Sequence, residues 1–114
     1  MRSLLAVPIL LLPLSACSSE LEVSPPALPD GTVGQPFEAL VTVSNNDTPL
    51  GGGRIIRGAM PPGLSMAEVE NDDTLPIRGV PEQAGSFSFE LELWCYATNF
   101  SGQSAARKYD IDIR

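Results

Sequence analysis

Three stretches of the chain alternate between apolar and polar side chains, and this alternation constrains the fold more than any other feature of the sequence. A period of two places the apolar side chains of a strand on one face, so each stretch predicts a half-buried antiparallel strand. Leu40 breaks the pattern in the first stretch. The apolar positions are Phe37, Ala39, Val41 and Val43, then Phe87, Phe89, Leu91 and Leu93, and finally Tyr109, Ile111 and Ile113.

Clusters of Gly, Pro, Asn, Asp and Ser between these stretches predict turns. They are Pro29–Gly31, Asn45–Asp47, Gly51–Gly53, Pro61–Gly63, Asn71–Asp73 and Ser101–Gly102. No segment keeps a helical apolar period over three turns, and 11 Pro and 10 Gly favour short strands. At 114 residues the chain is long enough for one domain at most. We therefore expect an all-β protein, an antiparallel β-sandwich of about seven strands.

Residues 1–16 have the composition of a secretory signal peptide. Arg2 supplies a positive charge, and Leu4–Leu14 form an apolar run. This run is shorter than the roughly 20 residues of a membrane-spanning helix, and Pro8 and Pro13 would break a stable helix. We expect residues 1–16 to be cleaved from the mature protein.

The residues at the expected cleavage site are Leu14-Ser15-Ala16-Cys17. They resemble the lipobox of bacterial lipoproteins, which implies a diacylglycerol joined to the Cys17 thiol by a thioether, cleavage before Cys17 and acylation of its new amino group. The alternative is an ordinary cleavage site that precedes a Cys by chance. Acyl chains on Cys17 would anchor the protein to the membrane. The residue after Cys17 is Ser18 and not Asp, which favours the outer membrane in a cell that has two. The resemblance thus predicts a lipid-anchored protein of the cell envelope.

Three further motifs occur in order along the chain, namely LPDGTVGQPF at 28–37, MPPGLS at 60–65 and IRGVPEQAGSFSF at 77–89. They resemble the bacterial immunoglobulin-like domains that are also called cadherin-like. The resemblance covers about Leu21 to Ile113 and implies an Ig-like β-sandwich domain over residues 21–114. Gly31 and Gly63 are expected to adopt positive φ in turns. Gly79 and Gly85 are expected to flank the turn into the longest strand.

Two arrangements are open for the segment that follows Cys17. If Leu21 and Val23 belong to the first strand, residues 17–20 form only a short tether, and three extended residues span about 10 Å. In the alternative, Ser18–Pro29 stays loose, with Pro25 and Pro26 in an extended polyproline conformation. We favour the short tether.

The best candidate for a binding surface is a group of aromatic side chains near the end of the longest strand. Trp94 and Tyr96, together with Phe100, fall on the nominally solvent-facing side. Exposed aromatic side chains at the end of a sandwich suit a protein or glycan partner. The alternative is that a bulge resets the strand register, or that a neighbouring strand or loop covers them.

Cys95 is the second Cys of the chain and follows the inward-facing residues Phe87 to Leu93 at the same spacing. A reactive thiolate needs a basic neighbour, a helix N-terminus or a metal. The neighbours in sequence are Trp94 and Tyr96, and the chain has no His. We expect a buried, unreactive thiol, and an intermolecular disulfide is the alternative.

Composition and motifs exclude several classes of function. The net charge of −7 argues against a nucleic-acid partner, which requires a basic surface. The absence of His argues against acid–base catalysis. Asn71–Asp73 could offer oxygen ligands to Ca²⁺ together with Glu68 and Glu70, but the paired calcium motifs of cadherins are absent, so we expect a solvated acidic turn. No metal or cofactor is expected.

These observations predict a non-catalytic binding or scaffolding module. It would be held at the cell envelope by the acyl chains on Cys17 and would bind a protein or a glycan. The alternative is a surface adhesion or carbohydrate-binding module that uses the face of Trp94 and Tyr96.

Overall fold

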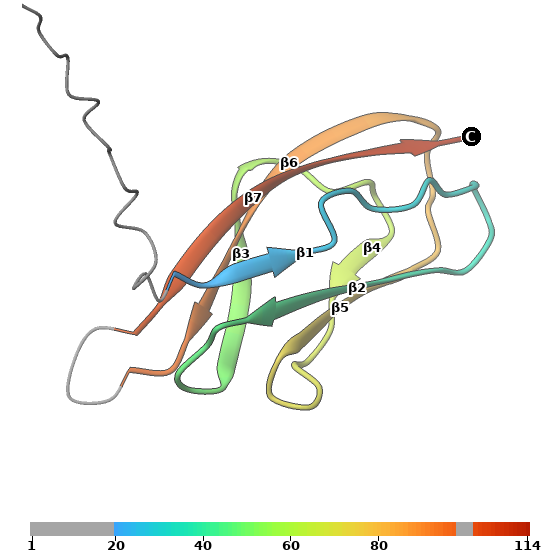
Figure 1. Cartoon of the computed structure of the whole chain (residues 1–114). Helices are drawn as coiled ribbons and strands as arrows, with labels where there is room; N and C mark the ends of the chain where they lie inside the picture. Colours follow the sequence, from blue (N-terminus) through green and yellow to red (C-terminus); the bar gives the residue numbers. More distant parts are fainter. Residues whose placement is uncertain (1–19, 98–101) are drawn as a thin grey trace, which may run out of the picture.

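The computed structural model describes residues 20–97 and 102–114. Over these residues the chain forms seven β-strands and no helix, so there is also no helix that is long and apolar enough to cross a membrane. The strands are β1 (Glu22–Ser24), β2 (Phe37–Ser44), β3 (Leu50–Gly58), β4 (Leu64–Met66), β5 (Thr74–Gly79), β6 (Gly85–Cys95) and β7 (Ser104–Ile113) (Figure 1). The prediction of an all-β chain with about seven strands is confirmed.

The strands form two sheets that pack face to face. One sheet has the order β1-β2-β5-β4 and the other has the order β3-β6-β7, and all neighbouring strands are antiparallel. Numbered along the chain, this is the strand arrangement of constant-type immunoglobulin domains. The protein is therefore an Ig-like antiparallel β-sandwich, as the sequence predicts.

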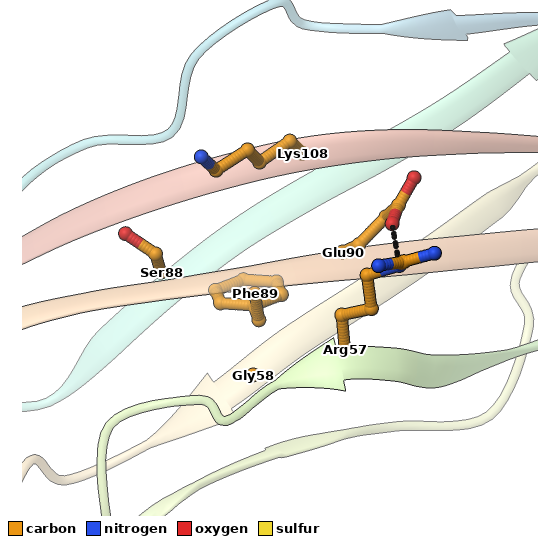
Figure 2. A pocket seen from close by; sticks show the side chains of 6 residues that line it. All are labelled: Arg57, Gly58, Ser88, Phe89, Glu90 and Lys108. Atoms are coloured by element: carbon orange, nitrogen blue, oxygen red, sulfur yellow. Dashed lines mark ion pairs between the residues drawn. The ribbon is translucent and has the colours of Figure 1, made fainter.

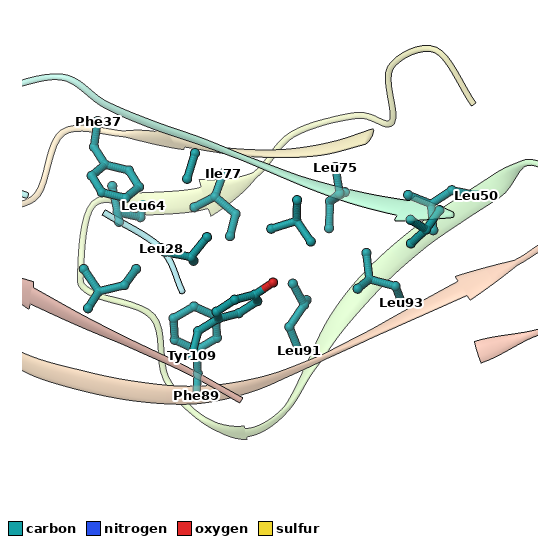
Figure 3. Packing of buried hydrophobic residues seen from close by; sticks show 14 of the residues in the cluster. Leu28, Phe37, Leu50, Leu64, Leu75, Ile77, Phe89, Leu91, Leu93 and Tyr109 are labelled. Atoms are coloured by element: carbon teal, nitrogen blue, oxygen red, sulfur yellow. The ribbon is translucent and has the colours of Figure 1, made fainter. Parts of the chain in front are cut away.

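The three alternating stretches are β2, β6 and β7, and their apolar side chains point between the sheets (Figure 3). Val41 and Leu91 lie on opposite sheets, and both are fully buried. Leu40, the residue that breaks the pattern, lies on the outer face of β2 and is 47% exposed. The period of two thus assigns the faces of these strands correctly, because a strand in a sandwich has one buried side.

The N-terminal segment is part of the sandwich. Val23 of β1 pairs with Val43 of β2, and the side chain of Leu21 is buried. The hydroxyl of Tyr109 donates a hydrogen bond to the carbonyl oxygen of Pro25 at 2.8 Å, which ties the segment after β1 to the opposite sheet. Residues 21–25 are therefore packed and hydrogen-bonded rather than loose.

The glycines of the family-like motifs have two different roles. Gly63 has a φ of 97°, as expected for its turn, and a Cβ there would lie 2.0 Å from the carbonyl oxygen of Val80. The expectation of positive φ at Gly31 is wrong. Gly31 instead forms a parallel bridge with Ile113 of β7, and a Cβ atom would lie 2.9 Å from the Cδ1 atom of Ile113. Glycine is needed at position 31 because the backbone passes close to the end of β7.

Candidate functional site

Trp94 and Tyr96 lie at the C-terminal end of β6, on the outside of the sandwich. Trp94 is 39% exposed and Tyr96 is 54% exposed. Their ring centroids are 5.6 Å apart and the ring planes are nearly perpendicular, at 88°. This edge-to-face contact is one of the favoured geometries for aromatic pairs. Phe100, the third candidate residue, lies outside the described residues.

The indole ring of Trp94 lies against the glycines of β3. Trp94 is paired with Gly52, and a Cβ atom on Gly51 would lie 2.0 Å from the Cζ3 atom of the ring. Gly53 packs against the core instead, where a Cβ atom would lie 2.8 Å from the Cδ2 atom of Leu75. The prediction of a turn at Gly51–Gly53 is wrong, because these residues belong to a strand whose two faces both lack room for side chains.

The strand on the other side of Trp94 also presents a small residue. Ser104 of β7 is the cross-strand partner of Trp94 and is exposed. Both strands that flank Trp94 therefore carry small residues beside it. We call the surface formed by Gly51, Gly52, Trp94, Tyr96 and Ser104 the aromatic platform.

Hydrogen bonds from neighbouring loops fix the backbone of the aromatic platform. The hydroxyl of Thr48 donates to the carbonyl oxygen of Tyr96 at 2.6 Å, and the amide of Tyr96 donates to the carbonyl oxygen of Pro49 at 3.1 Å. The side-chain amide of Gln103 donates to the carbonyl oxygen of Asn45 at 3.0 Å. These bonds join the connection between β2 and β3 to the start of β7, so both backbone groups of Tyr96 are held in place.

The described chain begins at this same end of the sandwich. The side-chain amide of Asn45 donates to the carbonyl oxygen of Glu20 at 3.4 Å. A hollow of about 320 Å³ lies between the segment before β1 and the start of β7, and it is lined by Glu20, Leu21, Gln103, Ser104 and Ala105. In Figure 1 the start of β1, the end of β6 and the start of β7 lie together, far from the C-terminus. Glu20 and the aromatic platform are therefore neighbours at one end of the molecule.

A second hollow, of about 290 Å³, lies on the outside of the same sheet at mid-strand (Figure 2). Arg57 and Glu90 form an ion pair across it, with 3.2 Å between Nε and Oε1. The Ser88 hydroxyl donates to the carboxylate of Asp110. Arg57, Ser88, Glu90 and Lys108 line this hollow with charged and polar groups on the outer surface of the sheet.

Cys95 points into the core, as the alternation along β6 predicts. Its side chain is buried, with 4% of the residue exposed. Burial raises the pKa of the Cys95 thiol, and the negative charge of Asp47 raises that pKa further. Both effects disfavour the thiolate, which is the reactive form.

The acidic segment Asn71–Asp73 forms the turn between β4 and β5. Asn71 and Asp72 have φ values of 55° and 65°, a conformation that Asn and Asp adopt more readily than most residues. Glu70 forms an ion pair with Arg78, with 2.9 Å between Oε2 and Nη2. Within residues 20–97 and 102–114, no three His, Cys, Asp or Glu side chains are grouped so that they could hold a metal ion.

No protein-family model and no curated protein matches the sequence of this chain. Solved structures do match its fold. The PapD-like domain 7 of human CEP192 has a TM-score of 0.54 and 12% identity, and the match covers 98% of each chain.

Two larger proteins contain a similar domain. The sialic acid binding region of the Streptococcus sanguinis SK1 adhesin has a TM-score of 0.59 and 13% identity, over 87% of this chain and 31% of the adhesin chain. The endo-fucoidan hydrolase MfFcnA4 of glycoside hydrolase family 107 has a TM-score of 0.61 and 16% identity, over 86% of this chain and 14% of the hydrolase. The chain thus spans less than a third of either protein. At these identities the likeness establishes the β-sandwich fold.

The sequence placed Trp94 and Tyr96 on the outside of β6, and the structure brings them into contact. It gave no sign that Gly51 and Gly52 accommodate the Trp94 ring, or that Glu20 lies at the same end. These relationships connect segments far apart in the chain, and no local pattern encodes them.

Proposed function

We propose that the chain is a lipid-anchored protein of the cell envelope whose Ig-like domain acts by binding or scaffolding. Cys17 would carry the acyl chains, and the outer membrane would be its location in a cell with two membranes. The lipobox-like residues Leu14-Ser15-Ala16-Cys17 after the apolar run support this proposal. Leu21 is already buried and β1 begins at Glu22, so a domain anchored at Cys17 would stand directly on the membrane.

The chemistry of the described residues supports binding rather than catalysis. Cys95 is a nucleophile by residue type, but it is buried and its raised pKa keeps the thiol protonated. The hydroxyl of Ser88 donates a hydrogen bond to the carboxylate of Asp110, and the chain contains no His that could act as its general base. The exposed aromatic platform, in contrast, is the kind of surface on which small β-domains bind their partners.

The lipid anchor can be tested by metabolic labelling with palmitate in a bacterial host. We expect the protein to take up the label and Cys17→Ala to abolish it. Cys95→Ala is the matched control, because it removes the other Cys and should leave the label unchanged. Labelling that persists in Cys17→Ala, or that is lost in Cys95→Ala alone, would contradict the anchor.

A carbohydrate-binding or adhesion module is the second candidate. Two observations favour it, namely the exposed Trp94 and Tyr96 rings and the fold shared with the sialic acid binding region of the Streptococcus sanguinis adhesin. Trp94 is the only Trp of the chain, so its fluorescence reports on this surface alone. A glycan that binds there should quench Trp94 emission in a saturable manner, and a panel of glycans without effect would exclude this candidate.

A further inference from the structure

We propose that the aromatic platform contacts the membrane surface, with Trp94 and Tyr96 seated among the lipid headgroups. This inference rests on the lipid anchor at Cys17 that is proposed above. It assigns the exposed aromatic pair to a lipid surface, and it gives the anchored domain one defined orientation on the bilayer.

The chain between Cys17 and the described domain is short. Three peptide units separate the Cα atom of Cys17 from that of Glu20, and these span at most about 11 Å when fully extended. Acyl chains on Cys17 place this residue at the boundary between hydrocarbon and headgroups. The interfacial layer outside that boundary is about 5–8 Å thick in a typical bilayer. Glu20 must therefore lie within or just outside the headgroup layer.

Glu20 is connected to the aromatic platform by hydrogen bonds. Glu20 accepts a hydrogen bond from Asn45, and Asn45 in turn accepts one from Gln103. Gln103 precedes Ser104, the cross-strand partner of Trp94. The carbonyl oxygen of Gln103 also accepts a hydrogen bond from the amide of Cys95 at 2.8 Å. Glu20 is thus connected with the aromatic platform through its hydrogen bond to Asn45, the hydrogen bond between Asn45 and Gln103, and the pairing of Ser104 with Trp94.

The exposed aromatic side chains gather at one end of the sandwich. Among the described residues, Trp94 and Tyr96 are the aromatic side chains with large exposure, and both lie at the end where the described chain begins. The opposite end exposes Val33 and Val80, which are aliphatic. Trp and Tyr are enriched at membrane–water interfaces, because an apolar ring with one polar group suits the headgroup region.

The end of the domain that carries the aromatic platform is acidic. Several acidic residues lie at the same end, namely Glu20, Glu22, Asp47, Asp72 and Asp73. Anionic headgroups would repel these carboxylates, and salt would screen the repulsion. The lipid surface that fits this end of the domain is therefore zwitterionic. Seating of Trp94 should weaken as anionic lipid is added and should recover when salt is raised.

The test uses the full-length lipidated protein, purified in detergent and reconstituted into phosphatidylcholine vesicles. Lipid brominated near the ester end of its acyl chains quenches Trp at the interface, and acrylamide quenches Trp in water. In these vesicles we expect the brominated lipid to quench Trp94. Compared with the same protein in detergent solution, the emission of Trp94 should shift to the blue and its quenching by acrylamide should decrease. Replacing part of the lipid with phosphatidylglycerol at low salt should reverse these changes.

A matched control moves the single Trp to the other end of the sandwich. Trp94→Phe combined with Val80→Trp retains an aromatic side chain at position 94 and places the reporter at an exposed site between β5 and β6. In this variant we expect no quenching by brominated lipid and full quenching by acrylamide. Circular dichroism of both proteins checks that the fold is retained.

The outcomes separate this inference from the anchor itself. If the protein floats with vesicles but Trp94 stays open to acrylamide, the anchor stands and the inference is wrong. Equal lipid quenching at positions 94 and 80 would also overturn it, because the domain would have no fixed orientation. Saturable quenching of vesicle-bound Trp94 by a soluble glycan would assign the platform to glycan binding. If Cys17→Ala floats like the unaltered protein, the proposed anchor fails and this inference fails with it.

Discussion

The indole ring of Trp94 fills the space that a side chain on Gly51 would need. A Cβ atom at Gly51 would come within 2.0 Å of the ring, whereas one at Gly52 would remain 3.3 Å from it. The register between β3 and β6 shifts between Leu50 and Gly52, so an irregularity in the strand pairing lies directly beneath the indole. Such bulges commonly re-aim a side chain. The exposed Trp94 is therefore held by the backbone on which it lies.

Gly51→Ala should displace the Trp94 ring from β3. Because the ring lies at the surface and can rotate away, and because Ala suits a strand better than Gly, we expect the free energy of unfolding to change by less than about 1 kcal/mol. Acrylamide quenching of Trp94 should increase clearly. Gly52→Ala is the control and should change quenching little. Equal quenching in the two variants would show that the ring is not held at Gly51.

Leu93→Ala should destabilise the domain strongly, because Leu93 is fully buried between the sheets. We expect a loss of about 2–5 kcal/mol in the free energy of unfolding, a large fraction of the stability of a small domain. Leu40→Ala removes the same atoms from the outer face of β2 and should cost less than about 0.5 kcal/mol. Urea unfolding followed by circular dichroism measures both. Similar urea midpoints for the two variants would contradict the assignment of Leu93 to a buried face and of Leu40 to an exposed one.

Tyr109→Phe should lower the free energy of unfolding by about 0.5–1.5 kcal/mol at neutral pH, since the hydrogen bond to the carbonyl oxygen of Pro25 is lost. Tyr96→Phe is the control. Because Tyr96 is 54% exposed, we expect the free energy of unfolding of the Tyr96→Phe variant to stay within about 0.5 kcal/mol of that of the unaltered protein. Urea unfolding at pH 7 compares the two variants.

The stability of the domain should also fall in alkaline solution. Burial raises the pKa of the Tyr109 phenol, although the positive charge of Arg107 opposes this effect. The unfolded chain therefore loses the phenol proton first, near pH 10, and the free energy of unfolding decreases as pH rises through that range. Tyr109→Phe should remove this part of the decrease. The part due to the raised pKa of Cys95 begins near pH 8.5, where the unfolded thiol ionises, and should remain. If the free energy of unfolding of Tyr109→Phe fell with rising pH just as that of the unaltered protein does, the assignment of this decrease to Tyr109 would be wrong.

Cys95 should resist thiol reagents in the folded protein. In the Cys17→Ala variant, Cys95 is the only thiol of the chain. We expect Ellman's reagent to react slowly at pH 8, because the thiol is buried and its pKa is raised, and to react at once after addition of guanidinium chloride. Rapid reaction of the native protein would indicate an accessible, reactive thiol. A dimer that dissociates only under reduction would instead favour the intermolecular disulfide.

Local patterns in the sequence determined which face of each long strand is buried. The alternation of Phe89, Leu91 and Leu93 with polar residues placed them, and Cys95 after them, in the core. It also placed Trp94 on the outside. This information is local because the side chains of a strand alternate between its two faces whatever it pairs with.

The roles of the glycines were decided by tertiary structure. Gly51–Gly53 looked like a turn because glycine is common in turns, yet in the sandwich they form the part of β3 that contacts Trp94 on one side and Leu75 on the other. Glycine is likewise needed at position 31 because the backbone passes close to Ile113, and not because the residue adopts a positive φ. In the sequence, a glycine shows only that a side chain is absent. Which residue occupies the space of that side chain depends on distant parts of the chain.

The sequence alone thus determined the all-β class and the buried faces of the long strands, since each depends on the periodicity of neighbouring residues, and the tertiary structure decided that no strand or loop among the described residues covers Trp94. Only the tertiary structure decided that Glu20, Gln103 and Trp94 share one end of the sandwich. That juxtaposition depends on the order of strands in two sheets and on the hydrogen bonds of the loops between them. No periodicity along the chain records which strand ends meet in space.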